Sequence, residues 1–247
     1  MIMREMVKLL DDVYENDFNF ESDYIYNGQI VPRVTKILSR CIHNDGLMYW
    51  ANSLGFKHQS YKRTLKEAAD IGTECHNCID SFLESITNNT KFSEPRWQSY
   101  RARNAFRGFL KWFKDVSSSA SVSIILHEHH LACRYFGGTL DGLYMINGKR
   151  YLVDYKTSNH ISFNYYLQLA AYRYMLRTEM GIEIDGCIIL QLDKNTESYN
   201  EFILDFSNLS HVDFINQCER TFFSLVYSYY NLYIVEDFYQ KIFGKGT

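Results

Sequence analysis

The sequence predicts a mixed α/β protein in which helices flank one sheet. Helical periodicity alternates along the chain with short strand-like runs. Three of these runs follow one another closely enough to form a meander. The composition is that of a compact globular chain, with 46% apolar residues, 22% charged residues and only two prolines. The order of elements is helix, three strands, helix and strand, with additions at both ends.

The first half of the chain predicts a hairpin and three helices. Residues 18–38 predict a hairpin that turns at Asn27-Gly28, and a helix that starts just after Pro32. Apolar side chains at spacings of three and four residues predict a helix over 61–87. A further helix is expected over 95–116, because the sequence SSSA follows it.

The rest of the chain predicts the sheet and two more helices. The meander strands are expected at 121–136, 138–146 and 149–157, and they are followed by a helix at 162–180, strands near 184–193 and 198–205, and an aromatic-rich helix at 207–240. No linker separates these elements. We therefore predict one domain over 1–247, with a lead-in at 1–60, a core at 61–205 and a C-terminal helical extension at 206–247.

Charge and cysteine content narrow the class of protein. A formal net charge of -3 argues against a protein coated in positive charge, although it allows a local basic groove. The sequence contains no run of about 18 apolar residues, which is the length needed to span a membrane. The first residues are too acidic for a signal peptide. The six cysteines are scattered, so we expect reduced thiols in a cytoplasmic protein. Cys75 and Cys78 have CxxC spacing without a second pair, which favours core packing over metal or redox chemistry.

The stretch LDGLYMINGKRYLVDYKTS, residues 140–158, carries charges inside strands that otherwise read as buried. Asn147-Gly148 is a strong type I′ hairpin signal. With these two residues as the loop, Asp141 falls directly opposite Asp154, and facing Cβ atoms lie about 4.5–5.5 Å apart. Because side chains alternate along a strand, Lys156 lies on the face of both carboxylates.

Two interpretations of this cluster remain open. Two carboxylates this close repel each other unless one takes up a proton or a cation lies between them. A divalent metal satisfies both, and hard oxygen ligands suit Mg²⁺ or Mn²⁺. Alternatively, Lys156 neutralises one carboxylate in a purely structural cluster, which would leave the second carboxylate unpaired.

These residues resemble the PD-(D/E)XK nuclease superfamily, most closely its RecB-like exonuclease branch. The sequence G-T-L-D at 138–141 is followed by D-Y-K at 154–156, with G-T-E-C-H at 72–76 upstream and Q-L-A-A-Y at 168–172 downstream. IVPRVTKILS is similar to the N-terminal entry segment of phage and mitochondrial genome-maintenance exonucleases. Arg33 takes the place of the serine that those proteins usually have in this segment. The resemblance implies a restriction-endonuclease-like core of order α-β-β-β-α-β, and a bacterial or phage-infected host cell.

The resemblance also implies roles for individual residues. Asp141 and Asp154 would be metal-binding carboxylates, His76 and the backbone carbonyl of Tyr155 further ligands, and Lys156 the group that assists the attacking water and the phosphate. A core histidine is the alternative for His76. Some members of this branch hold an iron–sulfur cluster, but after Lys156 this chain has only two well separated cysteines, so no cluster is expected.

Three further groups are candidates around the site. Gln168 and Tyr172 share a helical face, as substrate contacts or as ordinary packing. Glu128 could be another acidic group near the metal, although its strand parity relative to Asp141 is open. His127, His129 and His130 alternate faces, so we expect them to be structural or exposed.

A basic stretch follows at residues 96–114, which contain six basic and no acidic residues. On a helical wheel, five cations fall within about 80° of one another: Arg96, Arg103, Arg107, Lys111 and Lys114. We interpret this face as a phosphate track, with a solvated charged face as the alternative. Trp97 and Tyr100 could stack on unpaired bases.

The sequence therefore predicts a metal-dependent DNA exonuclease of replication, repair or recombination, acting on ends or single strands. An endonuclease on the same fold and a non-catalytic nucleic-acid-binding module are the alternatives. The repelling carboxylates argue against the latter, because a binding protein has no need for them.

Overall fold

The computed structural model describes residues 7–11, 20, 22–42 and 45–244. Its central feature is a five-stranded sheet in the order β3-β4-β5-β6-β7. The β5 and β6 strands run parallel and the other neighbours antiparallel. The strands span Val122–Ala132 (β3), Gly137–Ile146 (β4), Lys149–Lys156 (β5), Gly186–Leu192 (β6) and Tyr199–Asp205 (β7).

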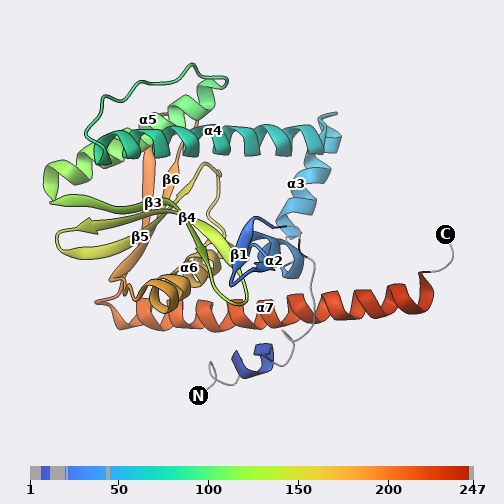
Figure 1. The fold of residues 1–247 in the computed structure, drawn as a ribbon. Coiled ribbons are helices and arrows are strands. Elements are labelled where there is room, and N and C mark those ends of the chain that lie inside the picture. The colour runs from blue at the N-terminus through green and yellow to red at the C-terminus, as the bar shows by residue number, and fades with distance from the viewer. Residues whose placement is uncertain (1–6, 12–19, 21, 43–44, 245–247) are drawn as a thin grey trace.

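Helices cover both faces of the sheet (Figure 1). The α4 helix (Tyr61–Thr87) and the α5 helix (Tyr100–Ser119) lie on one face, and α6 (Asn164–Met180) and α7 (Leu209–Phe243) lie on the other. On β5, Val153 belongs to the core under α4 and α5, whereas Leu152 belongs to the core under α6 and α7. Both side chains are fully buried, which confirms that this strand is covered on both sides.

The predicted core order α-β-β-β-α-β is confirmed by α4, β3, β4, β5, α6 and β6. The α4 helix has the predicted bounds. It begins after Ser60, whose side chain accepts a hydrogen bond from the backbone N–H of Arg63. Cys75 and Cys78 are buried on its inner side as free thiols, as core packing requires.

The N-terminal additions lie at one end of the sheet. The strands β1 (Tyr24–Tyr26) and β2 (Gln29–Val31) form a hairpin with positive φ at the turn residues Asn27 and Gly28, as predicted. Residues 18, 19 and 21 of the predicted segment lie outside the described residues. The α2 helix (Val34–Cys41) follows Pro32, and α3 (Asp45–Phe56) was not predicted.

Two predictions about α5 are wrong at its ends. The helix begins at Tyr100 instead of 95, because the Ser99 side chain caps it by accepting from the backbone N–H of Arg101. It also continues through the serines to Ser119.

None of the helices in the described part of the chain combines the length and the apolar character that a membrane span requires.

The β4–β5 hairpin has the predicted register. Asn147 and Gly148 both have positive φ, at 50° and 79°, and Gly142 pairs with Val153 at the last recorded step of the ladder. Asp141 and Asp154 are the next residues along each strand. The turn therefore brings the two carboxylates to the same end of the sheet.

Candidate active site

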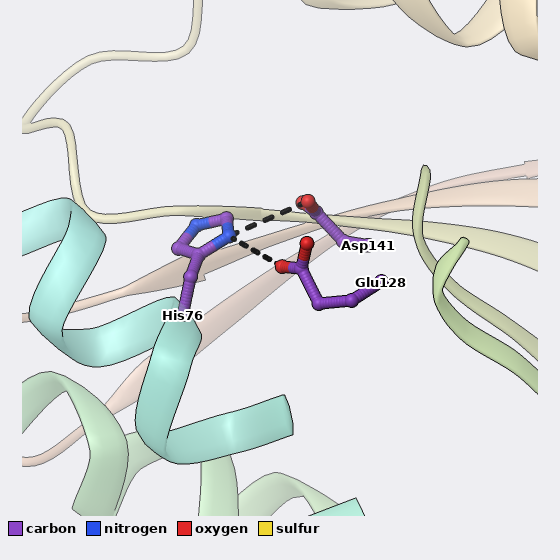
Figure 2. Close-up of side chains that lie close together, drawn as sticks. All are labelled: His76, Glu128 and Asp141. Carbon is purple, nitrogen blue, oxygen red and sulfur yellow. Dashed lines mark ion pairs between the residues drawn. The ribbon is translucent and has the colours of Figure 1, made fainter. Parts of the chain in front are cut away.

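Three potential metal ligands meet where α4 passes over the middle of β3 and β4 (Figure 2). His76 projects from α4, Glu128 from β3 and Asp141 from β4. The His76 Nδ1 atom lies 3.4 Å from Asp141 Oδ1 and 3.7 Å from Glu128 Oε1. One ligand atom from each of the three residues lies within 4.8 Å of the others, which is a spacing that one ion can bridge.

The orientation of His76 is fixed by the main chain of β5. Its Nε2 lies 3.1 Å from the carbonyl oxygen of Tyr155. Because a carbonyl only accepts, Nε2 carries the proton in this contact. In a neutral imidazole this leaves the Nδ1 lone pair directed at the two carboxylates, which is how outer hydrogen bonds orient metal-binding histidines.

Asp141 is held by the same residue of β5. Its Oδ2 accepts a hydrogen bond of 2.7 Å from the backbone N–H of Tyr155. The backbone pairing of β4 with β5 ends at Gly142 and Val153, and the Asp141 side chain continues the contact between the two strands beyond that point. The carboxyl is 9% exposed, so its position is fixed in the protein interior.

Glu128 reaches the cluster through an irregular backbone. Its φ is 39°, in the left-handed region that side chains other than Gly, Asn and Asp rarely adopt. The preceding residue, His127, also contacts α4, with its Nδ1 2.6 Å from Asp80 Oδ1. The expected alternation of faces is therefore broken here, because His127 and Glu128 both meet the same helix.

Asp154 and Lys156 form a second, more deeply buried pair. The Lys156 Nζ lies 2.6 Å from Asp154 Oδ2, and the Asp154 side chain is 2% exposed. This ion pair lacks the geometry of a hydrogen bond, and neither carboxylate oxygen has a hydrogen-bond partner among the described residues. The three-residue group with His76 contains Asp141 and Glu128, and Asp154 lies outside that group.

Lys156 is positioned by α6. Its ammonium donates to Gln168 Oε1 at 3.3 Å and lies 4.7 Å from the ring centre of Tyr165. The Gln168 amide in turn donates to the Tyr172 hydroxyl at 3.0 Å. The two residues predicted from the helical face therefore lie behind Lys156, and they form a chain of contacts that restricts its side chain.

The charges of His76, Asp141, Asp154 and Lys156 form two pairs. Burial lowers the pKa of His76, but Asp141 and Glu128 outweigh it and raise that pKa to about 10. Burial raises the pKa of Asp141, yet the His76 charge leaves it below its usual value. Burial raises the pKa of Asp154 to about 6, despite the opposing charge of Lys156. Each buried aspartate thus has its own cation, and neither is unpaired.

The residues fit a divalent cation. The donor set contains an imidazole and two carboxylates, with the two buried and unbonded oxygens of Asp154 close by. Oxygen-rich sites of this kind suit Mg²⁺ or Mn²⁺. Such an ion would take the place of the proton on His76 Nδ1, since a metal ligand must be deprotonated.

The positive charge of the predicted basic face at residues 96–114, most of which lies on α5, is partly compensated. Arg96 precedes α5 and is not on the helix. Glu94, just outside the basic stretch, lies 3.4 Å from Arg103 and 2.8 Å from Arg107, so the face is not of one sign. Lys111 and Lys114 lie on α5 as expected.

The predicted base-stacking residues differ in exposure. Trp97 packs on Phe106 with ring centres 5.6 Å apart and donates to Glu94. Tyr100 is 72% exposed.

The sequence model of the PD-(D/E)XK nuclease superfamily matches residues 53–228. The chain therefore belongs to this superfamily, and its mixed sheet with flanking helices is a restriction-endonuclease-like fold. No curated protein matches the sequence.

Two solved structures are similar to the chain, with low sequence identity and low TM-scores. The crystal structure of SSO0001 has 12% identity and a TM-score of 0.34, covering 90% of this chain and 85% of that one. A phage-related exonuclease from Haemophilus somnus 129PT has 10% identity and a TM-score of 0.33, covering 65% of this chain and 82% of that one. The family assignment rests on the superfamily match.

Proposed function

We propose that this protein is a divalent-metal-dependent deoxyribonuclease, acting as an exonuclease on DNA ends or single strands in replication, repair or recombination. The observation that carries the proposal is the cluster of His76, Glu128 and Asp141 beside the Asp154–Lys156 pair in a chain of a nuclease superfamily. The choice of DNA and of ends rests on the motif resemblance to RecB-like exonucleases.

In this proposal His76 Nδ1, Asp141 and Glu128 hold Mg²⁺ or Mn²⁺, and Asp154 completes the ligand set. The ion supplies Lewis-acid polarisation of the phosphate and lowers the pKa of the attacking water. Tyr155 contributes through its main chain, because its N–H and carbonyl hold Asp141 and His76 in place. Because Nδ1 and Nε2 point away from each other on the imidazole ring, the carbonyl acts here by orienting His76.

Lys156 acts on the phosphate. Burial lowers the pKa of its ammonium, but Asp154 and Asp141 outweigh burial and raise that pKa above its usual value. A fixed cation stabilises the charge that develops on the phosphate oxygens. Gln168 and Tyr165 keep the ammonium at the site as the substrate draws it away from Asp154.

The test is cleavage of end-labelled DNA with Mg²⁺ or Mn²⁺. We expect Asp141→Asn and Lys156→Ala each to lower kcat by at least about 10²-fold, with a circular dichroism spectrum like that of the wild type. Lys149→Ala is the matched control, because Lys149 lies at the opposite end of β5 and pairs with Asp205. Full activity of either site variant would contradict the proposal.

A second experiment separates exonuclease from endonuclease. The exonuclease proposal predicts that a linear single strand is degraded while a covalently closed single-stranded circle survives. Cutting of the circle would assign an endonuclease on the same fold. A linear RNA strand of the same sequence, assayed in parallel, tests the choice of DNA.

Calorimetry should detect Mn²⁺ binding by the wild type, and Asp141→Asn should abolish this binding. If the wild type bound no Mn²⁺, a non-catalytic binding module would be favoured.

A further inference from the structure

Two cations lie together just beyond the proposed active site. Lys194, in the turn between β6 and β7, donates from Nζ to the carbonyl oxygen of Thr157 at 3.0 Å. Thr157 directly follows Lys156. Arg101, in the first turn of α5, lies one helical turn before Asn104, whose side chain contacts the main chain of Lys194. Its charge adds to burial in lowering the pKa of Lys194. Two like charges held close together are unfavourable unless an anion joins them.

Neither cation has an ion pair with a carboxylate of the described residues. By contrast, Arg103 and Arg107, on the same helix as Arg101, are paired with Glu94. The Arg101 Nε is buried and has no hydrogen-bond partner within the described part of the chain. Asp193, the acidic neighbour of Lys194, instead accepts hydrogen bonds from the backbone N–H groups that follow it in the turn.

The turn that carries Lys194 is fixed in place. The Asn104 side chain, on α5, donates to the carbonyl oxygens of Lys194 and Asn195 at 3.2 and 3.4 Å. The same helix thus carries Arg101 and anchors the Lys194 turn. The two charged groups are therefore preorganised relative to each other, which reduces the entropy lost when a ligand binds.

A cavity of about 660 Å³ opens beside Arg101, between α4 and the start of α5. Its carboxylates on α4 are partly engaged, since Glu67 pairs with Arg63 and Glu74 accepts from the backbone N–H groups of Gln98 and Ser99. Asp70, exposed on α4, also lines it. The cavity thus mixes charges, with Arg101 on the α5 side and Lys66 among the carboxylates of α4.

We propose that Arg101 and Lys194 together bind one backbone phosphate of the nucleic-acid strand, next to the phosphate at the proposed active site. The inference rests on the proposed nuclease function. Because Lys194 contacts the residue after Lys156, the bound phosphate lies beside the proposed active site.

The test measures how binding depends on salt. The dissociation constant of a fluorescent single-stranded oligonucleotide is measured without divalent metal at several salt concentrations. For Arg101→Gln/Lys194→Gln we expect the magnitude of the slope of log K against log salt to fall by about 0.7 in all, because the two cations together neutralise one phosphate. In cleavage assays, KM should rise with little change in kcat. A slope and a KM equal to those of the wild type would overturn the inference.

Two variants control for charge and for folding. Arg220→Gln/Lys149→Gln removes the same charges at sites paired with Gln217 and Asp205 and should keep the wild-type slope. Arg101→Lys/Lys194→Arg keeps both charges and should also keep it. If this charge-preserving variant is folded, as judged by its melting temperature, and yet loses as much as the glutamine variant, packing and not charge is responsible, and the inference fails.

The source of the phosphate is tested with modified strands. A single uncharged methylphosphonate one linkage from the cleavage site should reproduce the effect of the double variant, and should add nothing to it. If removal of a terminal phosphate reproduces the effect instead, the pair recognises strand ends and the backbone assignment is wrong. Failure of the nuclease proposal is distinct, because it would appear as absent cleavage by the wild type.

Discussion

Glu128 combines a strained backbone with a side chain that the proposed metal centre uses. A left-handed φ costs a residue with a Cβ about 1–2 kcal/mol, and such strain is concentrated at functional sites. The neighbouring contact between His127 and Asp80 holds this part of β3 against α4. Without the irregularity, strand alternation would point Glu128 away from His76.

Comparison of Glu128→Gly with Glu128→Ala isolates the strain. Both variants lose the contact with His76, but only glycine adopts φ of 39° without steric cost. We expect the glycine variant to be more stable than the alanine variant by about 1 kcal/mol in urea unfolding. Both should bind Mn²⁺ more weakly than the wild type. An alanine variant as stable as the glycine variant would show that the backbone is not strained.

At the scale of elements, two glycines of the superfamily-like motifs have different structural roles. A Cβ added at Gly138, on β4, would lie 2.6 Å from the Tyr172 ring of α6. A Cβ added at Gly72, inside α4, would lie 3.5 Å from Thr157 Oγ1, which is an ordinary contact. Gly138 therefore allows α6 to bring Tyr172, and with it Gln168, close to the strands.

We expect Gly138→Ala to destabilise the protein by about 1–3 kcal/mol through overpacking. Gly72→Ala should be neutral or stabilise by up to about 1 kcal/mol, because alanine favours the helix interior. Urea unfolding measures both. In a Tyr172→Leu background the cost of Gly138→Ala should largely disappear, and an undiminished cost would show that the aromatic ring is not its cause.

The junction of β7 and α7 supplies a pH-dependent contribution to stability. The backbone N–H of Ser207 donates to Asp205 and, with the Lys149 ammonium, lowers the pKa of that carboxyl from 3.8 to about 2. A lowered pKa stabilises the folded state above the unfolded value. This stabilisation is therefore complete above about pH 4 and is lost as the pH falls through about 2.

Asp205→Asn should lower the melting temperature at pH 7 and have progressively less effect between about pH 4 and pH 2. Melting curves recorded by circular dichroism over this range provide the measurement. A difference from the wild type that stays constant with pH would mean that the contacts of Asp205 are not charge-dependent.

At the scale of the whole molecule, α7 serves two regions differently. Its first part packs under the sheet, and Tyr229 and Tyr230 farther along it are 1% exposed and pack on Phe20. Its last turns extend past α2 (Figure 1), and Val235, Phe238 and Ile242 there are more than half exposed. The stability of the described fold therefore depends on the first part of this helix.

Ending the chain after Asp237 should change the free energy of unfolding by less than about 1 kcal/mol, because the described side chains that are lost, at 238–244, are exposed. Ending it after Val226 removes the buried Tyr229 and Tyr230 and should destabilise the protein by several kcal/mol. Thermal unfolding distinguishes the two. A large loss in the shorter deletion would show that the exposed turns contribute to folding.

Local signals in the sequence predicted the features that depend on neighbouring residues. The Asn147-Gly148 turn predicted the register of β4 and β5, and the apolar spacing predicted α4 with its bounds. Features that depend on tertiary contacts were not predictable in this way. The φ of Glu128 has no sequence signal, and Glu94 compensates a basic face from outside the stretch that defined it.

The main chain of Tyr155 connects the proposed ligands His76 and Asp141, while its side chain lies in the core on a hydrogen bond to Tyr144. A peptide group is the same in every residue, so this connection leaves no mark in the written sequence. Ordinary mutagenesis cannot remove its carbonyl. Replacing the amide of residue 155 by an ester, which deletes the N–H alone, would be the direct way to ask how much the backbone contributes to the geometry of the centre.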